Sequence, residues 1–95
     1  MKLPASIWIG GRRLKIVKCK KLIDGKDLGE VDWDKHRIKF FYPHQDIKNT
    51  ILHECIHALE GHFHLDFKDS DVVRLATGLR MLFVDNPELI SIFYE

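Results

Sequence analysis

The sequence predicts an α+β fold, in which a small antiparallel sheet is followed by two main helices and a short C-terminal helix. Three observations lead to this prediction. Apolar and charged residues alternate through much of the first 42 positions, which is the period of a half-buried strand. From position 46 onward, apolar residues recur at helical spacing between Gly and Pro signals. The chain has 95 residues, so residues 1–95 are expected to form a single domain with one modest core.

The strands are expected as two hairpins. Residues 7–9 and 12–19 flank Gly10-Gly11, a glycine turn that joins two alternating segments. Residues 24–29 are rich in Asp and Gly and are expected to form a loop. A second hairpin follows over residues 31–42, with its turn at Asp34-Lys35. Pro43 ends the sheet region, because proline cannot donate a hydrogen bond to a strand ladder.

The helices are expected after residue 45. Asp46 is a candidate N-cap for a helix that runs to about Glu60, with Gly61 as its stop. Residues 62–68 form a connection, and residues 69–71 offer caps for a second helix that continues through position 83. Asn86-Pro87 places proline at a first helical position, which predicts a short closing helix over residues 88–93.

Composition narrows the class of protein. The net charge of +1 argues against a dedicated nucleic-acid surface, and the basic residues of the 12–21 segment are interpreted as the solvated face of a strand. Two cysteines far apart in sequence suggest no disulfide framework and fit a reducing compartment. Neither a secretory signal nor a membrane-spanning stretch is predicted, so the cytoplasm is the expected location.

The most informative motif is His53-Glu54-Cys55-Ile56-His57. Two histidines four residues apart on a helix stand one turn above each other, so both imidazoles can reach one ion. Zinc suits this pair best, and Glu54 lies beside the metal position, where it can accept a proton from water. The arrangement matches the H-E-x-x-H signature of zinc peptidases.

The flanking residues favour the metal interpretation. On a helical wheel, the apolar residues occupy one half of the helix, whereas Thr50, His53, Glu54 and His57 occupy the other. Such a helix can bury its apolar side and direct its histidines into a cleft. The alternative is an ordinary amphipathic helix with two surface histidines.

A catalytic zinc ion usually has three protein ligands and one open position. The motif supplies two, and the third is open among five residues that follow it. Two are histidines just beyond Gly61 and three are aspartates at or before the second helix, where acidic residues also serve as caps: His62, His64, Asp66, Asp69 and Asp71.

The segment from Asn49 to Leu89 resembles the small, single-domain zincin-like metallopeptidases encoded by phages and prophages. Those proteins carry T-[IL]-L-H-E-[IL]-[IL]-H-A-[IL], followed by an acidic residue ahead of V-x-x-L-A-x-G-L. The matching segments here are Thr50-Ile51-Leu52-His53-Glu54-Cys55-Ile56-His57-Ala58-Leu59 and Val72-Val73-Arg74-Leu75-Ala76-Thr77-Gly78-Leu79. The N-terminal half matches only in style, so the resemblance covers about half of the chain.

The resemblance implies a minimal zincin, with a small twisted sheet beside the metal-binding helix and a second helix behind it. It also implies that the third zinc ligand is Asp69, three positions before Val72. Related repressor-cleaving peptidases carry a glutamate there, so the shorter aspartate is a departure, as is Cys55 at an aliphatic position.

The expected function is zinc-dependent hydrolysis of a peptide bond in an intracellular protein or peptide, with Glu54 as the catalytic residue. The group that stabilises the oxyanion is open among Tyr42, His44, His36 and Arg80. By the same resemblance, a strand near the cleft binds the substrate as an added β-strand, and residues 35–42 are the nominated segment.

Two other functions compete with the peptidase. One is a non-catalytic, zinc-stabilised interaction or regulatory module of a phage or prophage, in which His62 or His64 completes four protein ligands. The other is a small nucleic-acid-binding or repressor-binding protein that works through the basic N-terminal strand.

Overall fold

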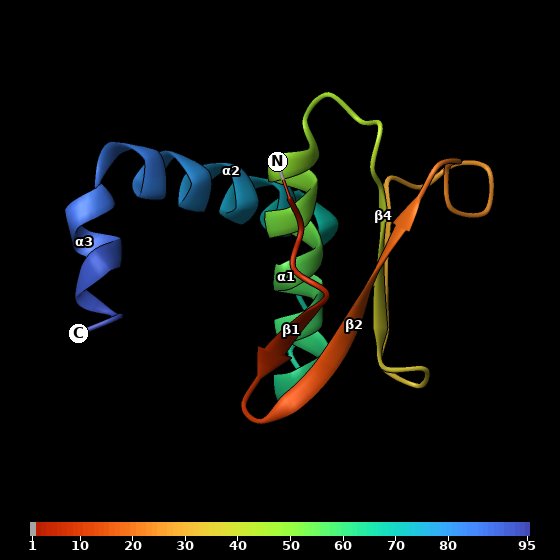
Figure 1. The fold of residues 1–95 in the computed structure, drawn as a ribbon, viewed down its shortest axis with the longest axis horizontal. Coiled ribbons are helices and arrows are strands. Elements are labelled where there is room, and N and C mark those ends of the chain that lie inside the picture. The colour runs from red at the N-terminus through yellow and green to blue at the C-terminus, as the bar shows by residue number, and fades with distance from the viewer. Residues whose placement is uncertain (1) are drawn as a thin grey trace.

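A computed structural model describes residues 2–95 and shows an α+β fold, a four-stranded sheet followed by helices (Figure 1). The strands are β1 (Ser6–Ile9), β2 (Arg12–Cys19), β3 (Gly29–Asp32) and β4 (Arg37–Phe41). The helices are α1 (Ile47–Phe63), α2 (Asp69–Asp85) and α3 (Pro87–Ile92). The predicted order of elements is confirmed, and their bounds agree closely with the expected ones.

Both predicted hairpins form. β1 and β2 pair antiparallel around Gly10 and Gly11, whose φ angles of 54° and 81° lie in the left-handed region that favours glycine. β3 and β4 also pair antiparallel, and the chain reverses through a turn at residues 33–36. The alternation of apolar and charged residues was therefore a sufficient guide to strand position.

The sheet is mixed, which corrects the expectation of a purely antiparallel one. Its strand order is β1-β2-β4-β3, and β2 runs parallel to β4. The loop after β2 carries the chain past β4, so that β3 forms the outer edge and β4 returns between its neighbours. Because β4 is paired on both sides, residues 35–42 cannot receive an added strand, and that nomination is wrong. The free edge beside α1 is β3.

The core lies between one face of the sheet and α1. Leu14, Ile38 and Phe40 from the central strands are buried against Ala58 of α1, and partly buried apolar side chains surround them. A smaller cluster joins Ile56 of α1 to α2. The second helix therefore packs on α1 rather than on the sheet, which places α1 between the two other layers.

Gly61 is not the stop of α1, contrary to the prediction. The helix continues to Phe63 and ends at His64, whose φ of 56° makes it a left-handed C-cap. The glycine instead serves a tertiary contact. A Cβ atom at position 61 would lie 2.5 Å from two atoms of the Trp33 indole ring, and Trp33 Nε1 donates a hydrogen bond of 3.1 Å to the carbonyl of Ala58.

The change Gly61→Ala is therefore expected to destabilise the chain by about 1–3 kcal/mol, the usual effect of overpacking, although alanine favours a helix. Gly78→Ala is the matched control, because nothing lies within 4 Å of its Cβ position in α2, and it is expected to stabilise by about 0.5–1 kcal/mol. Urea unfolding of both variants measures these free energies. Equal effects of the two substitutions would contradict the packing role of Gly61.

The prediction that residues 69–71 cap the second helix is wrong, because the N-cap of α2 is Lys68. Asp46 and Asn86 occupy the cap positions predicted for them, but neither side chain makes a cap hydrogen bond. Asp46 is the N-cap residue of α1 without a side-chain cap bond, and its carboxylate accepts a hydrogen bond of 2.6 Å from Arg80 of α2. Asn86 precedes Pro87 as expected, and its amide donates to the carbonyl of Leu82. Within residues 2–95, no helix is both long enough and apolar enough to cross a membrane.

Candidate metal centre

The histidines of the motif meet on the side of α1 that faces away from the core. Their Nε2 atoms lie 3.1 Å apart, and both side chains line a pocket of about 670 Å³. Helical spacing causes the approach, because residues four apart stand one above the other. The pocket is bounded by α1, by the start of α2 and by the segment that leads into β3.

One ring nitrogen of His57 forms a hydrogen bond with Glu60. Its Nδ1 lies 2.8 Å from Glu60 Oε1, and an ionised carboxylate can only accept, so Nδ1 carries the proton and Nε2 presents its lone pair. The other oxygen of Glu60 accepts a hydrogen bond of 3.0 Å from the backbone N–H of Phe67, which fixes the carboxylate. A carboxylate behind a ligand histidine is the usual outer shell of a zinc site. Glu60 was not among the residues predicted from the sequence, although its spacing of three from His57 was a usable signal.

The surroundings of His53 favour its neutral form. Burial and the neighbouring His57 lower its pKa, whereas the carboxylates of Asp69 and Glu60 act in the opposite direction. A neutral imidazole is the form that ligates metal. The lowered pKa of His53 therefore favours the form of this side chain that can bind a cation.

The spacing of the two histidines fits a zinc ion. Two nitrogen ligands on one tetrahedral zinc ion stand about 3.3 Å apart for bonds of about 2.0–2.1 Å. The observed separation of 3.1 Å is close to this value, and the carboxylate behind His57 fits as well. Among residues 2–95, no three His, Cys, Asp or Glu side chains are gathered closely enough to hold a metal as they stand. The two histidines thus fit the ion, and a third ligand would have to move inward.

Of the five candidates for the third zinc ligand, only Asp69 lines the pocket of the two histidines. It is the first residue of α2 and lines the same pocket as the two histidines. The pocket lining does not include the alternatives, Asp66, Asp71, His62 and His64. His62 instead contacts Arg12 and the Trp33 ring near the turn between β3 and β4.

Glu54 is buried beside the histidines. Its side chain lines the pocket and its residue is only 7% exposed. Burial raises the pKa of Glu54 to about 7, with Asp27 and Glu30 acting in the same direction and His57 against it. A carboxylate with a pKa near neutrality is suited to both accepting and releasing a proton.

Gly29, at the start of β3, makes this burial possible. A Cβ atom there would lie 2.5 Å from Cγ of Glu54, so only glycine lets the strand pass so close to the glutamate. Gly29 was expected in a loop and had no predicted role. Its contact with Glu54 is tertiary, and no local pattern in the sequence points to it.

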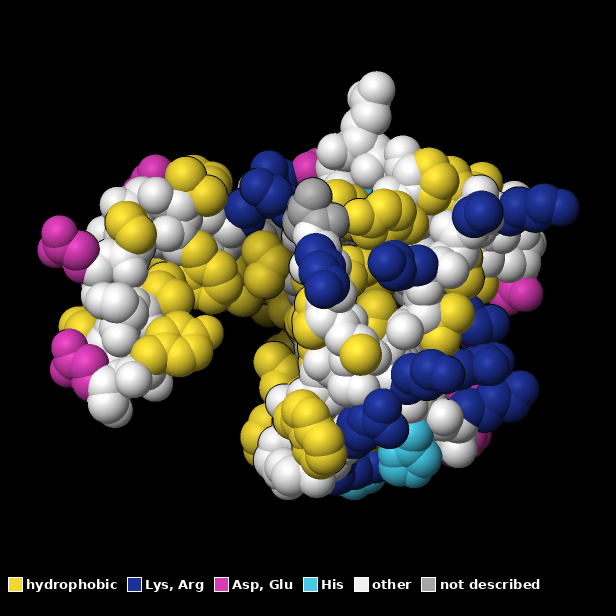
Figure 2. Space-filling model, viewed as in Figure 1, with side chains coloured by type: hydrophobic (Ala, Val, Ile, Leu, Met, Phe, Trp, Pro, Cys, Tyr) yellow, Lys and Arg dark blue, Asp and Glu magenta, His cyan; other side chains and the backbone are white. Residues whose placement is uncertain are grey.

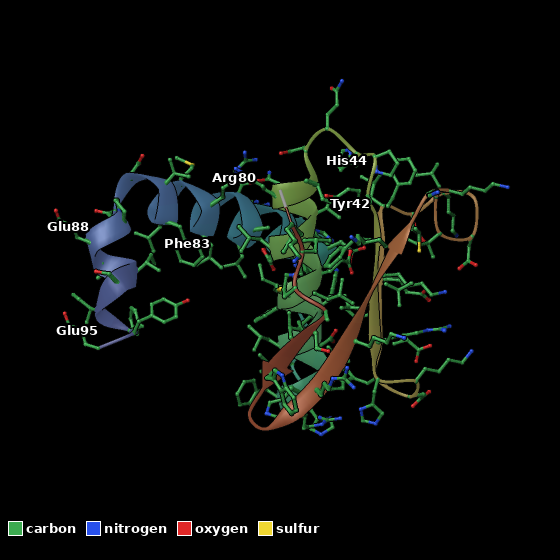
Figure 3. All side chains as sticks on the ribbon, in the orientation of Figure 1. Tyr42, His44, Arg80, Phe83, Glu88 and Glu95 are labelled. Atoms are coloured by element: carbon green, nitrogen blue, oxygen red, sulfur yellow. The ribbon has the colours of Figure 1, made fainter. Side chains whose placement is uncertain are left out.

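The four residues considered for stabilising the oxyanion lie in different parts of the structure (Figure 3). His44 lines the pocket, whereas Tyr42 packs on the sheet core and His36 lies against Trp33. Arg80 projects from α2 and bonds to Asp46 and Asn49, two residues of the pocket lining. His44 is therefore the one of these four candidates that lines the pocket of the motif.

Comparison with protein-family models, curated proteins and solved structures gives no match for this chain.

Proposed function

We propose that this protein is a zinc-dependent hydrolase that cleaves a peptide bond in an intracellular protein or peptide. The observation that carries the proposal is the facing pair of Nε2 atoms in His53 and His57, 3.1 Å apart beside the buried Glu54. Burial of a glutamate is unfavourable and rare in an ordinary amphipathic helix, and a buried glutamate beside two converging imidazoles is typical of a functional site.

The residues take separate roles. His53 and His57 would hold zinc through Nε2, and Asp69 is proposed as the third ligand. Zinc, when bound, polarises the scissile carbonyl and makes water a stronger acid. Glu54 accepts the proton of the attacking water and delivers it to the leaving amine. Glu60 orients His57 through its hydrogen bond at Nδ1.

Substrate is proposed to bind along β3. In the antiparallel ladder, the backbone N–H of Phe41 donates to the carbonyl of Leu28, so these two residues form a hydrogen-bonded pair. The alternation of the ladder then directs the N–H and C=O groups of Gly29 and Val31 away from β4. An extended peptide can pair with these groups and pass beside Glu54, which the Gly29 backbone approaches closely.

The pocket supports the hydrolase over a structural zinc module. A structural site needs four protein ligands, and the histidines proposed to complete it, His62 and His64, lie outside the pocket lining. A site with two histidines and one carboxylate keeps a position for water, as catalytic zinc requires.

Zinc content tests the proposal directly. Untagged wild-type protein is expected to hold one zinc ion per chain by elemental analysis, and His57→Ala is expected to hold almost none. His62→Ala is the matched control, because this histidine lies on the same helix outside the pocket lining, and it should retain the metal.

A second pair of variants tests the third ligand. Asp69→Asn should weaken zinc binding, whereas Asp71→Asn should leave it unchanged, since only Asp69 lines the pocket. If the wild type remains without zinc after incubation with the metal, the hydrolase proposal fails. If His62→Ala loses zinc as well, the four-ligand module becomes the better account.

A further inference from the structure

The C-terminal arm, defined as residues 81–95, stands away from the rest of the molecule. The end of α2 carries the chain outward and α3 turns back beside a gap (Figure 1). Within the described residues, α3 packs on α2 and has no comparable contact with α1 or the sheet. The Cα radius of gyration is 13.5 Å, whereas a compact domain of this length has about 12.4 Å. The protruding arm accounts for the larger radius of gyration.

The arm is apolar but has almost no core. Within it, Ile90 is the one residue that is even partly buried. Large side chains between 39% and 86% exposed follow one another along it: Met81, Leu82, Phe83, Val84, Leu89, Ile92, Phe93 and Tyr94. Together with Leu75 they expose roughly 1,000 Å², summed over all sides of the arm. A standard interface buries about 800 Å² on each partner, which is comparable to this total.

The apolar side chains gather where the arm faces the body. Figure 2 shows hydrophobic atoms on both walls of the gap, with acidic side chains on the outer side of the arm. In Figure 3, Phe83 lies on the gap side of α2 and Glu88 points outward. Leu75, Leu79 and Leu82 recur at helical spacing, so the stripe on α2 begins in the contact with α1 and continues into the gap.

The two ends of the chain carry opposite charge. The arm contains Asp85, Glu88 and Glu95 and no Lys, Arg or His. Residues 2–21 contain no Asp or Glu, and their basic residues are Lys2, Arg12, Arg13, Lys15, Lys18, Lys20 and Lys21. In a single copy the arm stays apart from this basic segment, so the attraction between them is available to a second molecule.

We propose that the arm is a dimerisation element, and that its occupant is a second copy of this chain. Each copy would place its arm in the gap of the other, so that both apolar walls are covered by one reciprocal, two-fold interface. A six-residue helix such as α3 is too short to be stable without packing, and its contact with α2 leaves most of its apolar side chains exposed. A partner that is present whenever the chain is folded would cover them. An identical chain meets that condition, and it brings the basic segment that complements the acidic arm.

Sedimentation equilibrium of the untagged full chain, from about 1 to 200 µM, tests this proposal. The wild type is expected to have a mass near twice the chain mass of 11.2 kDa. Leu82→Glu is expected to be monomeric, because it places a charge in the apolar stripe. Leu65→Glu is the matched control, since Leu65 is 47% exposed against 44% for Leu82 but lies outside both the arm and the basic segment, and it should remain dimeric.

Circular dichroism establishes that both variants keep the helical content of the wild type. Carbodiimide cross-linking of a mixture of ¹⁵N-labelled and unlabelled chains then locates the contact. Cross-links between the arm of one chain and the lysines of residues 2–21 of the other support the reciprocal packing. A wild type that stays monomeric overturns the proposal and leaves the arm as a surface for a different protein. A dimer that survives Leu82→Glu places the interface elsewhere and also overturns it.

Discussion

Glu54→Gln is expected to reduce peptide hydrolysis by about 10²–10⁴-fold while the zinc content stays unchanged. The amide has the shape of the carboxylate but cannot accept a proton from the attacking water. The two histidines and Asp69 are untouched by the substitution, so the metal should remain. The side chain is buried among pocket residues, and no bulk solvent base can replace it there.

The assay does not require a known substrate. Wild type and variant are incubated with a library of peptides prepared from a cell lysate, and new amino termini are counted by mass spectrometry. Glu60→Gln is an informative companion, because Glu60 orients His57 from outside the ligand set. It is expected to weaken zinc affinity by about 10–100-fold. A Glu54→Gln variant that cleaves at the wild-type rate would exclude Glu54 as the proton acceptor.

Local patterns in the sequence were enough to predict most elements. The glycine turn at Gly10-Gly11 and the alternation on either side of it define the first hairpin, and Pro87 marks the start of α3. These features act through backbone torsions and burial period, which neighbouring residues in the sequence largely determine. The pairing of β2 with β4 was missed, because strand order depends on how a loop crosses the sheet and not on the strands themselves.

Two glycines, Gly61 and Gly29, have roles that local sequence patterns do not predict. Gly61 was interpreted as a helix stop, and Gly29 was assigned to a loop. Both positions are determined by a side chain distant in sequence, the indole of Trp33 for Gly61 and the carboxylate of Glu54 for Gly29. The motif on α1 was visible from spacing alone, whereas spacing left the third ligand open and only the resemblance pointed to Asp69. Asp69 lines the pocket because α2 packs on α1. Tertiary packing, which has no short-range signature, carries this information.

Glu54 is expected to lower the free energy of unfolding of the metal-free protein as the pH rises from about 4.5 to about 7, whereas the lowered pKa of His53 acts in the opposite direction. The pKa of Glu54 is about 7 in the folded chain against an ordinary value of 4.5. The folded state therefore binds the proton more tightly than the unfolded state, and stability decreases across the interval between the two values. At about 1.4 kcal/mol per pKa unit, the full effect is about 3 kcal/mol.

Glu54→Gln isolates this contribution, since glutamine stays neutral at every pH. With zinc removed by chelation, the variant and the wild type should have similar free energies of unfolding near pH 4. At pH 8 the variant should be more stable by about 3 kcal/mol, as measured by urea unfolding at one protein concentration. Asp34→Asn, in the exposed turn between β3 and β4 and outside the pocket lining, is the matched control and should show no such change with pH. A pH-independent difference between Glu54→Gln and the wild type would contradict the burial of a charged Glu54. The expected result would mean that the chain maintains an unfavourable buried carboxylate in the pocket, a cost in stability that residues kept for chemistry commonly impose.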